Sequence, residues 1–271
     1  ATAGRTTLNG EGLQHQDGHS HILSSTIPNC ISYDPAYSYE LAIIIKEGMR
    51  RMYQEMDSVF YYITTMNENY QQPDMPKGVE DDIIKGMYLL EDGNSKEFKV
   101  SKPINKEQHI RLLGSGTILR ETRKAAEILR REYSVAVDVW SVTSFNELRR
   151  EALDIARGNM LNPSKKQKVP FVTKKLSTKK GPVLAATDYM KIYSDQIREF
   201  VPDAYRVLGT DGFGRSDSRE QLRHFFEVDM KFIVAAALFE LQTVGLIDSK
   251  ALMAHYKKLG IDTNKANPIY Q

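Results

Sequence analysis

The chain has 271 residues, 41% of them hydrophobic and 27% charged, a composition typical of a soluble globular protein with a sizeable core. Lys and Arg number 37 against 35 Asp and Glu, so the net charge of +2 provides no broad basic field and we expect no nucleic-acid partner. The single cysteine, Cys30, excludes an internal disulfide framework and favours a reducing compartment. With no charged leader and no apolar run long enough to cross a bilayer, we expect a cytoplasmic protein without a membrane partner.

A glycine-flanked turn near the first residue contains three histidines and a carboxylate within seven positions: His15, Asp17, His19 and His21. Histidine exchanges protons near neutral pH, and flanking glycines favour an exposed turn over a buried strand. The pattern therefore predicts an acid–base site formed by these residues. Two other interpretations stay open at this point: a metal site of Asp17, His19 and His21, although a fourth ligand at a recognised spacing is missing, and a surface turn whose histidines have no chemical role.

The residues after this turn predict a strand at Cys30–Tyr33, a helix at Tyr39–Met56 and a second strand at Val59–Thr65. The second strand is β-branched and aromatic throughout, which suits a strand buried on both faces of a parallel sheet. Met66–Tyr70 then leaves the carboxyl edge of that sheet, where open α/β sheets bind ligands.

The next segment, from residue 71 to about 108, is rich in proline, glycine and charge, with one helix-like piece near Asp81–Leu90, and predicts a domain boundary. Beyond it, strands and helices alternate with short connections, which favours a right-handed parallel sheet. The predicted strands are Ile110–Leu113, Ala136–Val142, Val169–Val172, Val183–Ala186 and Tyr205–Leu208. The predicted helices are Thr122–Tyr133, Asn146–Met160, Asp188–Phe200, Ser218–Phe226, Lys231–Val244 and Ser249–Leu259.

Two glycine-containing loops lie in this second part of the chain. Leu112–Gly116 lacks the third glycine of a dinucleotide-binding fingerprint, so we interpret it as a tight turn between a strand and a helix. In the loop Gly209–Arg219 we expect Ser216 or Asp217 to cap the following helix. The arginines of this loop, Arg215 and Arg219, either clamp a carboxylate or pair with aspartates of the same loop.

Seven lysines lie between Lys165 and Lys180. Such a concentration is typical of a solvated face, and an acidic partner surface is the alternative. Only Phe171 interrupts the run as an aromatic residue, so a stacking platform for single-stranded nucleic acid is not expected.

Four long motifs resemble one family: Gly4–His15, Thr26–Tyr37, Asn67–Tyr70 and Gly209–Arg219 are similar to segments of the homodimeric, bacterial-type pyruvate dehydrogenases. These enzymes are part of the thiamine diphosphate-dependent transketolase superfamily. Gln16–His21 resembles the turn that carries an active-site histidine in transketolase. The resemblance runs essentially end to end and corresponds to the C-terminal third of the family's sequence.

The resemblance implies an α/β fold in three parts: the rear of a pyrimidine-binding thiamine-enzyme domain at residues 1–75, a linker at 76–108, and a transketolase C-terminal-like domain with a mainly parallel sheet at 109–271. It implies that the intact enzyme binds thiamine diphosphate and magnesium between the subunits of a homodimer. That enzyme decarboxylates pyruvate and acetylates the lipoyl groups of dihydrolipoyl acetyltransferase. His15 resembles the family's substrate-facing histidine, with His19 and His21 nearby to stabilise the first adduct or to move protons to the lipoyl sulfur.

Two features of the family are missing from this sequence: the motif that holds magnesium and diphosphate, and the segment with the glutamate that activates the aminopyrimidine. We expect both upstream of Ala1, so the cofactor-binding residues are expected outside this chain and the chain alone is expected to be inactive. The alternative is a non-catalytic dimerisation or interaction module in which the histidines are incidental. A nicotinamide enzyme that uses Gly114–Gly116 is not expected, and Lys174–Lys180 is unlike typical members of the family.

Overall fold

The computed structural model describes residues 4–8, 12–94 and 104–271. The strands of this part of the chain are β1 (Cys30–Tyr33), β2 (Phe60–Ile63), β3 (Met87–Glu91), β4 (Asn105–Gly114), β5 (Val135–Val142), β6 (Val183–Ala186) and β7 (Tyr205–Leu208). Its α-helices are α1 (Ser20–Ser25), α2 (Ser38–Met49), α3 (Glu80–Lys85), α4 (Ile118–Tyr133), α5 (Phe145–Leu161), α6 (Phe171–Leu176), α7 (Lys191–Asp195), α8 (Arg219–Phe225), α9 (Met230–Thr243) and α10 (Ser249–Leu259). Shorter turns are the 3-10 helices η1 (Leu13–His15), η3 (Arg198–Phe200) and η4 (Pro268–Tyr270), and the π-helix η2 (Arg50–Gln54) that continues α2.

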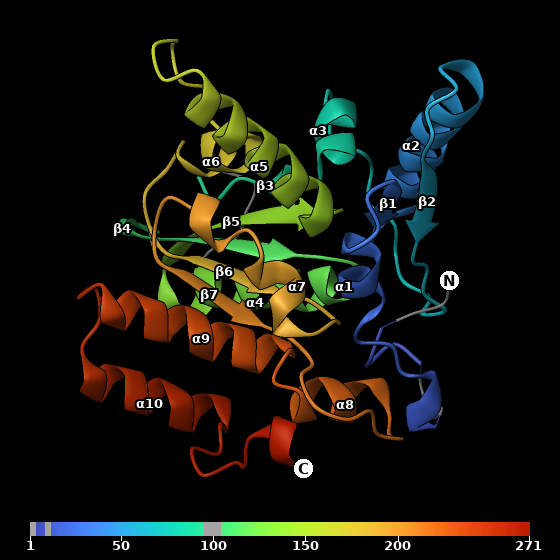
Figure 1. The fold of residues 1–271 in the computed structure, drawn as a ribbon. Helices are drawn as coiled ribbons and strands as arrows, with labels where there is room; N and C mark the ends of the chain where they lie inside the picture. Colours follow the sequence, from blue (N-terminus) through green and yellow to red (C-terminus); the bar gives the residue numbers. More distant parts are fainter. Residues whose placement is uncertain (1–3, 9–11, 95–103) are drawn as a thin grey trace.

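The described strands form a mixed α/β fold with two sheets, β1-β2 and β3-β5-β4-β6-β7. In the larger sheet β4 to β7 are parallel and only β3 is antiparallel. Figure 1 shows this sheet at the centre, with α5 and α6 on one side, α9 and α10 on the other, and β1, β2 and α2 beside it. Each face of the larger sheet has its own buried core, which explains why all eight residues of β5 are buried.

The smaller sheet pairs β1 with β2 in parallel, with Tyr33 opposite Ile63. Both strands were predicted at these places, but the expectation that the second is buried on both faces is wrong. Phe60 is 45% exposed and the other residues of β2 are half-buried. In the described part of the chain β2 has a single neighbouring strand, and α2 packs on one of its faces, so the strand is only partly covered.

The segment 76–108, expected to be a linker, contributes α3 and β3 to the fold. The helix predicted at Asp81–Leu90 ends early, because Gly86 takes the left-handed conformation with φ of 110° and a side chain there would overlap Ser144. The chain then enters β3, which pairs with β5 as the edge strand of the larger sheet. Residues from Met87 onward are therefore continuous with the C-terminal sheet.

Two other predictions were wrong in detail. Val169–Val172 is not a strand, because Pro170 precedes the helix α6 and its carbonyl accepts a hydrogen bond from the Lys174 backbone N–H at 2.9 Å. The helix predicted at Asp188–Phe200 is divided into α7 and η3. The remaining predicted strands and helices are confirmed, with ends that differ by a few residues.

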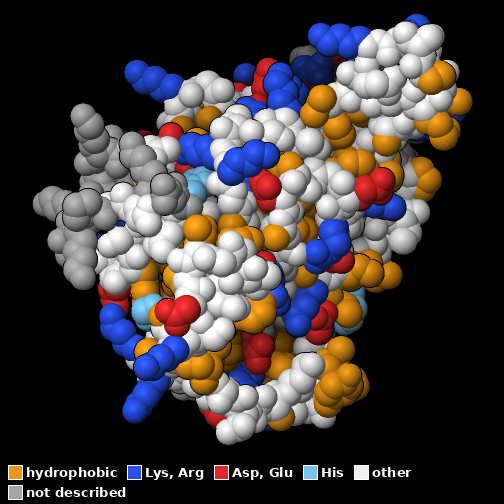
Figure 2. Space-filling model, turned by 90° about the vertical axis from the view of Figure 1, so that its left-hand side faces the viewer, with side chains coloured by type: hydrophobic (Ala, Val, Ile, Leu, Met, Phe, Trp, Pro, Cys, Tyr) orange, Lys and Arg blue, Asp and Glu red, His pale blue; other side chains and the backbone are white. Residues whose placement is uncertain are grey.

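On the face shown in Figure 2, Lys and Arg are interspersed with Asp and Glu, without a large surface of a single sign. Among the described helices, none is long and apolar enough to cross a membrane.

Candidate active site

The structure separates the three histidines of the N-terminal turn. His15 is the last residue of η1 and is exposed, and His19 immediately precedes α1 and is also exposed. His21, inside α1, is fully buried. Helix positions two apart face different directions, so His19 and His21 do not form one pair of ligands or catalysts.

Asp17 organises the backbone of this turn. Its Oδ1 accepts hydrogen bonds from the backbone N–H groups of His19, at 2.8 Å, and Ser20, at 2.9 Å. These bonds satisfy N–H groups at the start of α1 that have no partner within the helix. Asp17 therefore has a structural role in the turn.

His21 lies in an aromatic cage. Its ring stacks on Tyr193 with centroids 4.8 Å apart, and Tyr189 and Tyr62 meet it edge-on at 4.6 and 5.5 Å. Burial lowers the pKa of His21 to about 3, so the imidazole is neutral at physiological pH. Its Nε2 lies 3.0 Å from Oγ1 of Thr64.

Thr64 and Asp34 lie at the carboxyl ends of β2 and β1, and both are buried. The Thr64 hydroxyl donates to Oδ1 of Asp34 at 2.7 Å. Burial raises the pKa of Asp34 to about 7, against the opposing effect of the Thr64 hydroxyl. The turn Gly114–Gly116, which we interpreted as a tight connection, closes over this carboxylate: Gly116 has φ of 48°, and a Cβ at this position would overlap Asp34.

Asp188 is a second buried carboxylate, two residues after the carboxyl end of β6. It accepts hydrogen bonds from the backbone and hydroxyl of Thr6, at 3.0 and 2.7 Å, and from the Thr7 hydroxyl at 2.6 Å. Burial raises the pKa of this carboxyl, while the two threonines oppose the increase. The N-terminal segment is thereby held across the carboxyl edge of the larger sheet.

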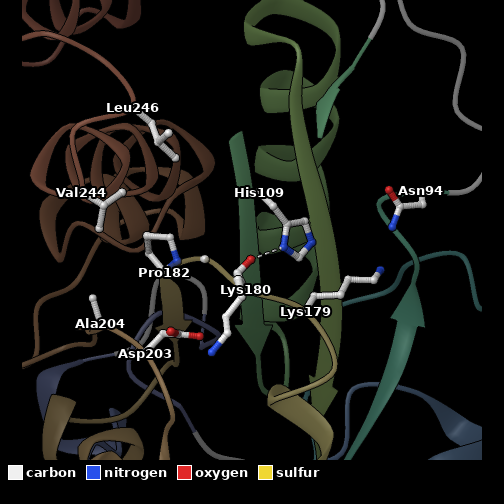
Figure 3. Close-up of a pocket in the computed structure, with 10 residues that line it drawn as sticks. Asn94, His109, Lys179, Lys180, Pro182, Asp203, Ala204, Val244 and Leu246 are labelled. Atoms are coloured by element: carbon white, nitrogen blue, oxygen red, sulfur yellow. Dashed lines mark hydrogen bonds between the residues drawn. The ribbon is translucent and has the colours of Figure 1, made fainter. Parts of the chain in front are cut away.

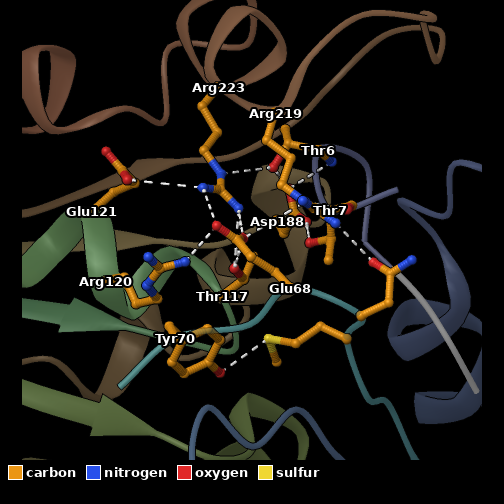
Figure 4. A network of polar contacts seen from close by, with 12 residues as sticks. Thr6, Thr7, Glu68, Tyr70, Thr117, Arg120, Glu121, Asp188, Arg219 and Arg223 are labelled. Carbon is orange, nitrogen blue, oxygen red and sulfur yellow. Dashed lines mark hydrogen bonds and ion pairs between the residues drawn. The ribbon is translucent and has the colours of Figure 1, made fainter. Parts of the chain in front are cut away.

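A cluster of ionic contacts joins the loop after β2 to the C-terminal domain (Figure 4). Glu68 pairs with Arg120 and, at 2.5 Å, with Arg223, and it accepts from the Thr117 hydroxyl at 3.0 Å. Burial opposes ionisation of Glu68, but Arg223 and Arg120 lower its pKa to about 2. Glu68 is therefore ionised, and its ion pairs connect the two parts of the chain.

The loop Gly209–Arg219 has structural roles that the sequence did not indicate. Ser218, not Ser216 or Asp217, caps α8. Arg219 donates to the Thr7 carbonyl at 2.7 Å, and Arg215 lies 4.3 Å from the centre of the Phe225 ring. These two contacts are made within the chain, and neither is the carboxylate clamp or the pairing with an aspartate of the loop that the sequence left open.

Two lysines of the basic segment Lys165–Lys180 form ion pairs with carboxylates elsewhere in the chain. Lys175 pairs with Asp82, and Lys179 lies 2.7 Å from Asp138 and 2.6 Å from Asp92. A cavity of about 700 Å³ lies beside it, at the amino ends of β4 and β6 (Figure 3), lined by Asn94, His109, Lys179, Lys180, Gly181, Pro182, Asp203, Ala204, Val244 and Leu246. This edge of the sheet is opposite the one that meets Asp34, so the cavity is separate from the histidine turn.

The metal interpretation of the turn gains no support from the geometry. Within the described residues no group of three or more His, Cys, Asp or Glu side chains is placed to hold a metal ion.

Sequence reasoning did not single out Thr64, Asp34 or Asp188 as site residues. The available signal was their position directly after predicted strands, because the carboxyl ends of parallel strands meet at one edge of a sheet.

Residues 86–229 match the family model of the transketolase-like TK C-terminal domain. The chain belongs to this family. In this family member, residues 1–73 also match the pyruvate dehydrogenase E1 component middle domain. The two matched regions contact each other at the carboxyl edge of the larger sheet. Asp34 and Glu68 of the first region contact the second region there, and Asp188 of the second region contacts Thr6 of the first.

Among curated proteins, the transketolase-like chain is 57% identical over 99% of its length to the pyruvate dehydrogenase E1 component of Pseudomonas aeruginosa, and 55% identical over 98% to that of Escherichia coli K12. It spans only about 30% of the length of these relatives. Among solved structures it resembles a transketolase mutant from Pichia stipitis, with a TM-score of 0.60, 15% identity and coverage of 92% of this chain and 32% of that one. It also resembles a structure titled split gene transketolase, inactive beta4 tetramer, with a TM-score of 0.53, 16% identity and coverage of 85% and 63%. The structural similarities establish the fold alone.

Proposed function

We propose that this chain is part of a pyruvate dehydrogenase E1 component that decarboxylates pyruvate with thiamine diphosphate and magnesium, as a cytoplasmic homodimer. The acetyl group then passes to the lipoyl domains of dihydrolipoyl acetyltransferase. The observation that carries the proposal is the 57% identity to a curated E1 component along 99% of this chain, which includes the histidine turn. We further propose that residues 1–75 and 109–271 are the two main parts of this enzyme, connected by residues 76–108, which also contribute α3 and the edge strand β3 to the fold.

The residues described here do not fit the magnesium and diphosphate part of the cofactor. They contain no cluster of ligands for a cation, and the buried carboxylates Asp34 and Asp188 are engaged by threonine hydroxyls. The magnesium and diphosphate of the cofactor are therefore bound, in this proposal, by other parts of the parent enzyme. The same reasoning leads us to propose that the chain alone is inactive.

We propose that the exposed imidazoles His15 and His19 exchange protons with the substrate or the lipoyl group. Both reach solvent, whereas His21 is enclosed by aromatic rings and neutral. A solvent-accessible imidazole is able to take up and release protons during turnover. Asp17 holds the turn that carries them.

The test is release of carbon dioxide from carboxyl-labelled pyruvate by the parent enzyme and by this chain. We expect turnover by the parent, none by the chain, and a loss of about 10²-fold or more in kcat for His15→Ala in the parent. His255→Ala, on α10 and outside the turn, is the matched control and should retain activity. Turnover by the isolated chain would refute the inactivity, and full activity of His15→Ala would favour the alternative of a non-catalytic interaction module.

A further inference from the structure

A chain of three buried polar groups runs from α1 to the end of β1. Nε2 of His21 lies 3.0 Å from Oγ1 of Thr64, which lies 2.7 Å from Oδ1 of Asp34. All three side chains are at most 3% exposed. Because these groups are shielded from solvent, water does not satisfy an unpaired donor or acceptor among them. Each proton is therefore expected on the atom from which it can form a hydrogen bond within the protein.

The Thr64 hydroxyl carries a single proton and has two acceptors beside it. One is Oδ1 of Asp34 at 2.7 Å, and the other is the carbonyl of Tyr33 at 3.3 Å. Oδ1 of Asp34 is the stronger acceptor of the two, because it is closer to the hydroxyl and belongs to an ionisable carboxylate. When Asp34 is ionised, the Thr64 proton is therefore directed at Asp34 and not at His21.

Thr64 can then face His21 only as an acceptor. The hydroxyl oxygen is able to accept hydrogen bonds through its lone pairs while its own proton is directed at Asp34. A neutral imidazole carries one proton, so His21 has to carry it on Nε2 in order to donate to Thr64.

The other nitrogen of His21 agrees with this assignment. Nδ1 is buried and, within the described part of the chain, makes no hydrogen bond. The backbone carbonyl of His21, by contrast, accepts a hydrogen bond from the Asn146 side chain at 2.8 Å. Nδ1 is thus the lone-pair nitrogen of a fully enclosed imidazole.

We propose that Thr64 and Asp34 are positioning residues that fix the tautomer of His21, with the proton on Nε2 and the lone pair on Nδ1. A group that donates a hydrogen bond or a proton to His21 in the assembled enzyme then has to contact Nδ1. The tautomer follows from this chain alone, whereas its use in turnover rests on the proposed function.

The experiment is long-range ¹H–¹⁵N spectroscopy of this chain labelled with ¹⁵N-histidine, at pH 8.5, where Asp34 is ionised. We expect wild type and Thr64→Ser, which keeps the hydroxyl, to show His21 as the Nε2–H tautomer. Thr64→Val keeps the size but lacks the hydroxyl and should lose the single tautomer. A proton on Nδ1 in wild type, or an unchanged pattern in Thr64→Val, would overturn the proposal; the wild-type spectrum decides this even if the valine variant fails to fold.

The same pair of substitutions in the parent enzyme separates the tautomer from its use. A kcat that falls at least tenfold in Thr64→Val but not in Thr64→Ser supports a role of the fixed tautomer in turnover. Equal kcat values, with the tautomer confirmed in the chain, would refute that role of His21 and leave the assignment of the proton intact.

Discussion

Replacing Asp34 by asparagine keeps the shape of a buried side chain and removes its titration, so it should change how the free energy of unfolding depends on pH. Burial raises the pKa of Asp34 from 3.8 to about 7, so the folded state holds this proton more tightly than the unfolded state. The stability that this proton contributes is complete below about pH 4 and is lost as the pH rises to 7. Over an interval of about three pH units, at about 1.36 kcal/mol each, the change is on the order of 4 kcal/mol.

His21 opposes this dependence in the wild-type protein. Burial lowers the pKa of His21 from 6.5 to about 3, so its contribution to stability is complete above about pH 6.5 and is lost as the pH falls. Between pH 4 and 6.5 the two effects have opposite signs and similar size. These two contributions should therefore largely cancel in this interval, and Asp34→Asn should expose the loss due to His21.

The assay is urea unfolding of wild type, Asp34→Asn and the exposed control Asp74→Asn between pH 4 and 8. The free energy of unfolding of wild type minus that of Asp34→Asn should increase by about 4 kcal/mol as the pH falls from 7 to 4. The corresponding difference for Asp74→Asn should stay within about 0.5 kcal/mol. A difference for Asp34→Asn that does not vary with pH would refute the reasoning, because it would mean that the carboxyl is ionised throughout. The neighbouring carboxyls Glu40 and Asp188 contribute to the raised pKa, and they are present in all three proteins.

Other substitutions test the remaining structural roles. Glu68→Gln leaves buried arginines without their partner and should lower the free energy of unfolding by about 3 kcal/mol, while the exposed control Glu127→Gln changes it by less than about 0.5 kcal/mol, both measured in urea. Gly116→Ala should destabilise the protein by at least about 1 kcal/mol, since a Cβ would overlap Asp34, whereas Gly158→Ala in α5 has open space and should stabilise it by about 1 kcal/mol. The apolar side chains exposed along α2 and η2 should make the isolated chain self-associate, and Met49→Glu should shift sedimentation toward the monomer; a monomeric wild type would contradict this.

The strands of the larger sheet were predictable because their signal is local. Val183–Ala186 and Tyr205–Leu208 are short apolar runs that lie between turns, and the structure confirms both with the same ends. Val169–Val172 has a similar composition, but Pro170 sets the start of a helix there, and the packing of α6 against the sheet decides the outcome. The burial of β2 was mispredicted because it depends on which strands lie beside it.

Only part of the candidate site could be predicted from the sequence. The histidine turn stands out by composition, and its residues were named from that pattern and from the family resemblance. Thr64 and Asp34 are 30 positions apart and come together because Tyr33 pairs with Ile63 in parallel register, so that the next residue of each strand meets at the same edge. That register is a property of the paired strands and is not encoded in either segment separately.

Helix periodicity explains why one short turn holds two kinds of imidazole. His19 precedes α1 and faces solvent, and His21, two positions later, faces the interior, where the aromatic cage keeps it neutral. His15 and His19 are therefore in contact with solvent, and His21 is not. A buried imidazole with a fixed tautomer offers a hydrogen-bond acceptor of constant charge, a different chemical role from that of its exposed neighbours. Under the proposed function, substitution of His19 should lower the kcat of the parent enzyme, whereas substitution of His21 should disturb the packing and hydrogen bonding of the site.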